Sequence, residues 1–294
     1  MQVSANGISL EVDDRGAPDG APLVMIMGLG MQLVAWPDGL VDLLVERGFR
    51  VIRFDNRDIG LSQRFDHLGV PNLALAGMRH TLGLPVASPY RLADLADDTA
   101  GLIESLGLGS AHVCGASMGG MVAQHLAARH PQRVKSLTLM MTTSGAPHLP
   151  QPSLRVRLAL MSRPADPRNI DSVVDHFVKL YGVIGSPAYP SPPALLRERI
   201  AASVRRSYRP AATVRQLAAI MADGERTALL QRIAAPTQII HGDADPLVPV
   251  ACGHDLARRI AASKLDVIEG MGHDLPQPLW TRFAQDIATL AGLG

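Results

Sequence analysis

The stretch His112-Val113-Cys114-Gly115-Ala116-Ser117-Met118-Gly119-Gly120-Met121 decides how the rest of the chain is interpreted. An apolar run, Ala111 to Cys114, precedes a turn of small residues, and apolar residues at helical spacing follow from Met121. Residues 115–119 fit the pattern G-x-S-x-G, in which a serine lies on a sharp turn between a strand and a helix. The glycines let strand and helix pass closely around a strained backbone. The motif in this context predicts that Ser117 is a nucleophile.

The composition is that of a globular protein of 294 residues, with 47% hydrophobic and 19% charged residues. The net charge of +1 gives no overall attraction for nucleic acid or for an anionic membrane. Two cysteines, Cys114 and Cys252, are too few for a disulfide framework. The first residues lack the basic and apolar blocks of a signal peptide, and no apolar run is long enough to span a membrane. We therefore expect a cytoplasmic protein that binds neither nucleic acid nor membrane.

Strand-like and helix-like patterns alternate along most of the chain. This order predicts an α/β fold with a mostly parallel sheet flanked by helices. Residues 64–89 form a long proline-containing segment that is expected to be irregular, and such a segment is usually functional or mobile. The predicted strands are Ile8–Asp13 (an edge strand), Pro22–Met27, Arg50–Phe54, Ala111–Cys114, Val134–Met141, Thr237–His241 and Leu265–Ile268. The predicted helices are Trp36–Arg47, Tyr90–Leu106, Met121–His130, Cys252–Ile260 and Leu279–Leu290.

The alternating pattern is interrupted between Gly145 and Ala235. This part is punctuated by proline and has apolar residues at helical spacing, without a convincing strand. We therefore predict an α/β core at residues 1–145 and 236–294 and an inserted helical cap at residues 146–235. Twelve arginines and one lysine against six acidic residues give this cap a net charge of +7. The favoured interpretation is a solvated arginine-rich exterior, and attraction for anionic substrates is the alternative.

A serine hydroxyl is a weak nucleophile, so it needs a base and a carboxylate that orients the base. His273 follows the last predicted strand and lies between turn residues, which makes it the candidate general base. Asp243 and Asp245 both follow the strand that ends at His241. We favour Asp245, because Pro246 biases its backbone to an extended geometry, and Asp243 would then stabilise the turn. The order serine, aspartate, histidine is that of hydrolases with a nucleophile elbow.

Acyl transfer to a serine also needs hydrogen-bond donors for the oxyanion that develops. The N–H of Met118, at the start of the predicted helix, is the first candidate, and the N–H of Leu29, after the predicted strand Pro22–Met27, is the second. The cap and residues 64–89 are expected to form the substrate pocket. The residues expected next to the substrate are Gly28, Trp36 and Leu247.

Four motifs resemble those of the α/β-hydrolase superfamily, and the resemblance covers nearly the whole chain. Met27-Gly28-Leu29-Gly30 stands where the family often has His-Gly-x-x, and residues 55–62 resemble its D-x-R-G-x-G-x-S loop with Asp58 in place of the first glycine. Gly242-x-x-Asp245-x-x-x-Pro249 and Gly272-His273 resemble its acid and histidine loops. Within the superfamily, these loops and the helical cap look most like bacterial esterases related to aclacinomycin methylesterase. The resemblance implies an α/β-hydrolase fold and a serine esterase.

No metal or cofactor is expected. The histidines and cysteines lack metal-ligand spacing, and Leu33 stands where a dinucleotide fingerprint starting at Gly28 needs its third glycine. The main hypothesis is a serine carboxylic-ester hydrolase that acts through an acyl-enzyme on a small to medium-sized apolar ester. The same triad would serve a lactonase, a macrolide esterase, a C–C bond hydrolase or a perhydrolase, and a non-catalytic hydrolase-like ligand receptor is the alternative from another class. The oligomeric state stays open, with a homodimer formed through the cap as one option.

Overall fold

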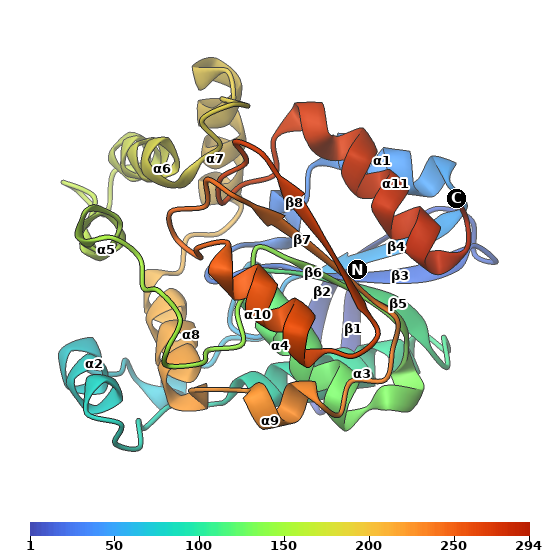
Figure 1. The fold of residues 1–294 in the computed structure, drawn as a ribbon. Coiled ribbons are helices and arrows are strands. Elements are labelled where there is room, and N and C mark those ends of the chain that lie inside the picture. Colours follow the sequence, from blue (N-terminus) through green and yellow to red (C-terminus); the bar gives the residue numbers. More distant parts are fainter.

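A single eight-stranded sheet organises the computed structural model, which describes all residues 1–294 (Figure 1). Its order is β1-β2-β4-β3-β5-β6-β7-β8; β1–β2 and β2–β4 are antiparallel and the other pairs are parallel. The predicted α/β fold with a mostly parallel sheet is thus confirmed. The strands are β1 (Gln2–Ala5), β2 (Ile8–Arg15), β3 (Ala21–Ile26), β4 (Phe49–Phe54), β5 (Ala111–Ala116), β6 (Val134–Met140), β7 (Thr237–Gly242) and β8 (Ser263–Ile268).

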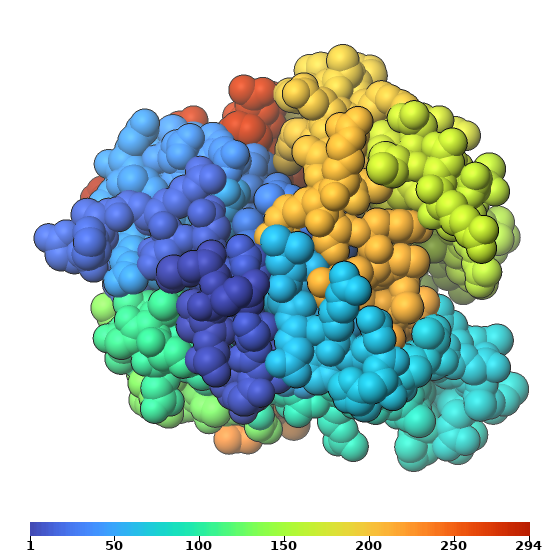
Figure 2. Space-filling view, turned by 180° about the vertical axis from the view of Figure 1, so that it is seen from behind, coloured from blue at the N-terminus to red at the C-terminus, as the bar shows by residue number.

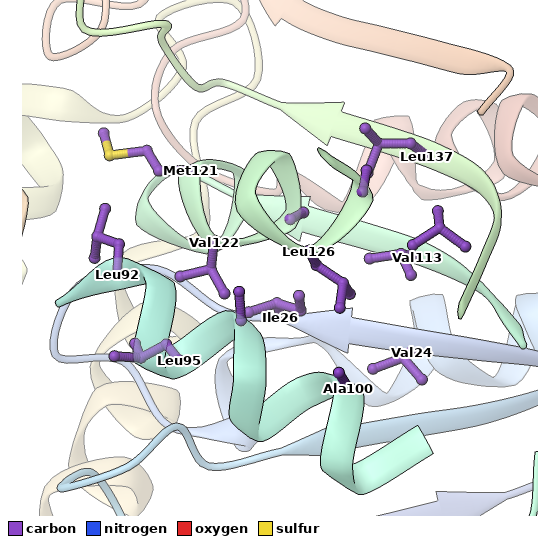
Figure 3. Packing of buried hydrophobic residues seen from close by; sticks show 14 of the residues in the cluster. Val24, Ile26, Leu92, Leu95, Ala100, Val113, Met121, Val122, Leu126 and Leu137 are labelled. Carbon is purple, nitrogen blue, oxygen red and sulfur yellow. The ribbon is translucent and has the colours of Figure 1, made fainter. Parts of the chain in front are cut away.

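Helices cover both faces of the sheet (Figure 1). On one face, α1 (Asp38–Glu46) and α11 (Trp280–Ala291) pack together over a core of methionine, leucine and phenylalanine side chains. On the other, α3 (Leu92–Ser105), α4 (Met118–Arg129) and α10 (Ala251–Arg259) bury a larger cluster, part of which is shown in Figure 3. The central strands are apolar on both sides because both faces are covered. Short 3₁₀ turns lie at Leu33–Ala35, Asp66–Leu68, Pro131–Arg133 and Gln277–Leu279.

The parallel strands bring four loops to one edge of the sheet. The loops that follow β3, β5, β7 and β8 carry Gly28, Ser117, Asp245 and His273, respectively. Because the carboxyl ends of neighbouring parallel strands meet at the same edge, residues distant in sequence lie together there. This edge is therefore where a site can form.

A helical segment, residues 146–235, separates β6 from β7. We call it the helical insertion. It contains helices and no strand. Most of its helices lie beyond one end of the sheet together with α2 (Leu73–Thr81), whereas its last short helix packs on α4, as Figure 1 shows. Seen from behind in Figure 2, residues near 60–80 (light blue) adjoin the part of the insertion near residues 200–220 (orange). Its helices are α5 (Leu154–Met161), α6 (Ile170–Ile184), α7 (Pro193–Arg206), α8 (Pro210–Asp223) and α9 (Thr227–Leu230).

Two sequence-based expectations need correction. The strand predicted at Ile8–Asp13 is not an edge strand, because β1 pairs outside it and covers that edge. The segment predicted to be irregular contains α2, whose start is capped by the Asn72 side chain accepting from the N–H of Leu75. This helix leaves most of its apolar side chains exposed, so its sequence has no clear buried stripe. None of the helices combines the length and the apolarity needed to cross a membrane.

Candidate active site

The turn at Ser117 holds its side chain in a fixed place. Ser117 has φ 54 and ψ −120, a strained conformation for a residue with a side chain. Its N–H donates to the carbonyl of Met140 (3.0 Å), and its carbonyl accepts from the Thr142 hydroxyl (2.7 Å). A Cβ atom at Gly119 would lie 2.0 Å from the carbonyl oxygen of Ile26, so only glycine fits where the helix crosses β3. The strain is thus supported by contacts on both sides of the turn.

Ser117, His273 and Asp245 form one chain of hydrogen bonds. The Ser117 Oγ lies 3.0 Å from Nε2 of His273, and Nδ1 of His273 lies 2.7 Å from Oδ2 of Asp245. A carboxylate only accepts, so Nδ1 carries a proton, and the neutral imidazole then accepts from the serine hydroxyl through Nε2. The imidazole is therefore in the tautomer that a general base needs.

The acid loop distinguishes the two candidate carboxylates. Asp245 is buried, and its Oδ1 accepts from the N–H groups of Leu247 (2.9 Å) and Val248 (2.8 Å) while Oδ2 faces His273. Asp243 instead accepts from the N–H of Gly270 (2.7 Å), a contact between two turns. The structure thus brings Asp245, and not Asp243, to the imidazole.

The structure contains a second serine–histidine contact, which lacks the carboxylate present in the first. The Ser136 hydroxyl on β6 lies 2.8 Å from Nδ1 of His112 on β5. No carboxylate contacts His112, and burial lowers the pKa of its imidazole to about 4. This pair therefore lacks the group that orients and stabilises a protonated imidazole. The thiol of Cys114 is no rival nucleophile either, because burial raises its pKa to about 12.

Two N–H groups beside Ser117 make no hydrogen bond within the protein. These are the backbone amides of Met118, the first residue of α4, and of Leu29, in the loop after β3. This loop lies against the nucleophile, since a Cβ atom at Gly28 would be 3.2 Å from Cβ of Ser117. Met118 is buried and Leu29 is partly buried. The two amides are free to donate to a bound oxygen.

The three predicted substrate neighbours lie in three different environments in the structure. Gly28 adjoins Ser117, and Leu247 is partly exposed in the acid loop, where it packs beside Val248. Trp36 is fully buried in the core between α1 and α11. With no accessible surface, its side chain cannot line a pocket in this conformation, so the expectation for Trp36 is wrong here.

The end of α6 is bonded to the loop that carries His273, a feature that sequence reasoning missed. The N–H of His273 donates to the carbonyl of Ile184 (2.7 Å), and the N–H of Gly272 donates to the Ser186 hydroxyl (2.8 Å). The Ser186 hydroxyl donates to Asp274, which also accepts from the Ser186 N–H. Burial raises the pKa of the Asp274 carboxyl above its ordinary value, although these hydrogen bonds oppose the shift. The residues on both sides of the imidazole are thereby held by the helical insertion.

Asp58, where the resembled loop has glycine, is a buried ion-pair partner. It has φ 74, a left-handed conformation that aspartate adopts more readily than most residues. Its carboxylate accepts two hydrogen bonds from Arg215 of α8, at 2.5 and 2.9 Å, and one from the Tyr90 hydroxyl at 3.1 Å. Burial and the adjacent Asp58 raise the pKa of Tyr90. The side chain at this position therefore joins the core to the helical insertion.

Other arginines of the helical insertion are also bound to the core. Arg206 donates to Asp55 (2.7 Å), Arg209 to the carbonyl of Ser62 (3.1 Å) and Arg226 to Gln124 (2.9 Å). The expectation of a solvated exterior is wrong for Arg215 and Arg226, which are buried, and Arg206 and Arg209 are only partly exposed. All four form hydrogen bonds to core residues. The arginines on and after α5 are exposed as expected, namely Arg155, Arg157 and Arg163.

A serine, a histidine and a carboxylate in one hydrogen-bonded chain, at the carboxyl edge of a mostly parallel sheet, define the class of α/β hydrolases. The family described as "alpha/beta hydrolase fold" matches residues 21–180, and this chain belongs to it.

Comparison with individual proteins shows relatives along nearly the full length. A rhodomycin D methylesterase from Streptomyces peucetius is 28% identical and covers 93% of this chain and 92% of its own, which confirms the predicted relation to bacterial methylesterases. A 2-hydroxymuconate semialdehyde hydrolase from Pseudomonas sp. strain CF600 is 27% identical and covers 99% of this chain and 92% of its own. Among solved structures, a meta-cleavage product hydrolase from Pseudomonas fluorescens has 19% identity, covers 99% of this chain and 97% of its own, and has a TM-score of 0.76, which shows the shared fold.

Proposed function

We propose that this chain is a serine carboxylic-ester hydrolase that works through an acyl-enzyme, with Ser117 as nucleophile, His273 as general base and Asp245 as the carboxylate that orients it. The observation that carries the proposal is the 3.0 Å contact between the Ser117 Oγ and His273 Nε2, backed by the 2.7 Å contact between His273 Nδ1 and Asp245. The similarity to a methylesterase supports an ester as substrate.

Acylation follows from this geometry. His273 Nε2 takes the hydroxyl proton as the Ser117 Oγ attacks the ester carbonyl carbon, and the carbonyl oxygen becomes an oxyanion. The N–H groups of Met118 and Leu29 donate to that oxyanion. When the tetrahedral intermediate collapses, the bond to the alkoxy oxygen breaks, and His273 gives its proton to the departing alcohol. The acyl group stays on Ser117.

Deacylation uses the same groups. A water molecule gives a proton to His273 Nε2 and attacks the acyl carbon, and the two N–H groups stabilise the second oxyanion. Collapse then breaks the bond to the Ser117 Oγ, which recovers its proton from the imidazole. Throughout, Asp245 stabilises the imidazolium and keeps Nδ1 protonated. The net reaction adds one water to one ester and releases an alcohol and an acid.

The helical insertion acts as a cap over this site in the proposed enzyme. It contacts the histidine loop through Ser186 and the loop after β3 through α8, so two of the loops that border Ser117 are attached to it. Gly28 and Leu247 are the proposed substrate contacts. The proposed substrate is a small to medium-sized apolar ester, bound between the core and the cap.

Turnover of short p-nitrophenyl esters by the purified chain tests the proposal. Ser117→Ala should abolish turnover and also labelling by a fluorophosphonate, with the label on the wild type found at Ser117 by mass spectrometry. Ser136→Ala is the matched control, because it removes the hydroxyl from the other serine–histidine pair and should leave turnover unchanged. Full turnover by Ser117→Ala would refute the proposal.

C–C bond hydrolysis is the second candidate, because a 2-hydroxymuconate semialdehyde hydrolase is similar over the whole chain. The same triad serves both reactions, so a vinylogous diketone should be assayed beside the esters. Hydrolysis of the diketone without any ester turnover would replace the first proposal with the second.

A further inference from the structure

The loop that carries the Leu29 amide is a tight turn. The N–H of Met31 donates to the carbonyl of Gly28 (3.2 Å), and Gly30 has φ +67, as the third residue of such a turn needs. Met27 stands where the resembled family often has histidine, and methionine offers no strong hydrogen bond to brace the turn. Other residues must therefore fix its position.

One brace comes from the core and one from the helical insertion. Asn56 donates to the carbonyl of Met27 (2.9 Å), which holds the end of β3. Gln216 of α8, a fully buried side chain, accepts from the N–H of Gly30 (2.8 Å). Thr213, one turn earlier on α8, also presses on the loop, since a Cβ atom at Gly30 would lie 2.7 Å from its Oγ1. The turn is therefore held by contacts with the core on one side and with the helical insertion on the other.

We propose that Gln216 is a positioning residue for the oxyanion donor. It binds the N–H of Gly30, the residue next to Leu29, and so sets the direction of the Leu29 amide beside Ser117. This inference rests on the proposed function, in which that amide donates to the oxyanion. The neighbouring ion pair of Arg215 with Asp58 fixes the same helix against the core, so the acceptor is presented by an anchored element.

Displacement of the Leu29 amide should weaken stabilisation of the transition state and leave substrate binding nearly unchanged. A donor matters for rate when it lies within hydrogen-bond distance of the oxygen as negative charge develops, and small displacements weaken it strongly. Loss of the Gln216 carbonyl lets the turn shift while the pocket walls stay in place. The effect should therefore be on kcat, with little change in KM.

Gln216→Met tests this, because methionine has a similar length and no acceptor of comparable strength. We expect kcat for a p-nitrophenyl ester to fall about 10- to 100-fold at nearly constant KM. An alkyl boronic acid forms a tetrahedral adduct with a serine nucleophile and uses the same donors. Its inhibition constant should rise in step with the fall in kcat.

Three further variants separate positioning from general destabilisation. Gln216→Glu keeps an oxygen acceptor for the N–H of Gly30 but loses the N–H that Gln216 donates to the carbonyl of Arg57 (3.4 Å), so it should restore part of kcat. Gln216→Asn withdraws the carbonyl with less disturbance, and provides the same readout if the methionine variant does not fold. Gln124→Met is the matched control: Gln124 is also fully buried and also contacts the helical insertion, through Arg226, but lies away from the turn. It should lower the melting temperature and leave kcat unchanged.

The outcomes distinguish the inference from the function beneath it. A wild-type chain that neither hydrolyses esters nor reacts with a fluorophosphonate would overturn both. An active wild type whose Gln216→Met and Gln216→Asn variants keep full kcat and boronate affinity would overturn the inference alone. A parallel loss of kcat in Gln124→Met would do the same, since it would show that any weakening of the insertion suffices.

Discussion

The two sides of the helical insertion are attached to the core in opposite ways. On the α8 side, Arg215 has a side chain only 1% exposed and is paired with a fully buried Asp58. On the α5 side, Leu158 and Met161 are 59% and 78% exposed, and the helix packs mainly on α6 (Figure 1). On the α8 side a charged side chain is therefore buried, whereas on the α5 side a leucine and a methionine side chain are exposed to solvent.

Hydropathy therefore does not tell which helices of an insertion are anchored to the core. A buried arginine with a bidentate carboxylate partner is fully satisfied, and it fixes orientation as well as distance. Exposed leucines on a short helix gain nothing from the core. The α8 side should accordingly be the stable part and the α5 side the part that opens locally.

The largest expected effect is on the α8 side. Arg215→Met leaves the Asp58 carboxylate buried without its cation, and breaking a buried pair from one side costs about 3–5 kcal/mol. Denaturant unfolding of wild type and variant gives the difference in unfolding free energy. The control is Arg197→Met, which removes an exposed arginine paired with Asp175 between α6 and α7 and should leave stability unchanged. Equal stability of the two variants would contradict the comparison.

The next effect depends on pH. Burial raises the pKa of Asp223 at the end of α8, but hydrogen bonds from His125 and Arg226 more than offset this and hold it below 3.8. A lowered pKa in the folded state adds stability above the unfolded value, and that stability disappears as the pH falls. Asp223→Asn should cost about 1–2 kcal/mol of unfolding free energy at pH 7. The gap from wild type should close as the pH falls through and below 3.8; a gap that widened in acid would have the wrong sign.

A smaller effect is expected where the α6 end meets the histidine loop. Ser186→Ala removes the hydroxyl that bridges Gly272 and Asp274 and should lower kcat about tenfold, because the imidazole loses its support. Steady-state kinetics across pH 5–9 measures it. Ser172→Ala, at the start of the same helix, also removes a hydrogen-bonding hydroxyl and should leave kcat as in the wild type. Identical kcat values for both variants would show that the contact is only structural.

The smallest effect is on α5. Leu158→Gln replaces an exposed leucine, so the unfolding free energy should change by no more than about 0.5 kcal/mol. Val156→Ala on the same helix is the comparison, because Val156 is buried and its truncation leaves a cavity. Denaturant unfolding should rank Val156→Ala as the more damaging change. The reverse order would mean that α5 packs through its leucines.

The features of the fold and of the site that could be predicted are those marked by local sequence patterns. The buried strands are continuous apolar runs, and the small residues around Ser117 and the turns beside His273 are visible without knowing any partner. These signals located the sheet and the loops that meet at its edge. The choice of Asp245 over Asp243 followed from Pro246 and from the resemblance of residues 242–249 to the acid loop, and the structure places Asp245 at the imidazole.

The features that could not be predicted depend on contacts between residues far apart in the sequence. Arg215 lies 157 residues from Asp58 in sequence, so nothing in the pattern around Arg215 shows that it is buried. β1 is a short strand without an apolar run, and only its pairing with β2 shows that it is a strand. The contacts of Ser186 and Gln216 likewise depend on how two separate segments meet. The one usable signal was Asp58 itself, an acidic residue where the resembled loop has glycine.

The ion pair of Asp58 limits how the helical insertion can be exchanged between related proteins. Residues 146–235 leave the core after β6 and return before β7, so the segment looks like a cassette that recombination or engineering could swap. The arginines of α7 and α8 are matched, however, to carboxylates at Asp55 and Asp58, far away in the same gene. A chimaera that imports this segment alone would leave Asp55 and Asp58 buried without these arginines, so residues 55–62 should be exchanged together with it.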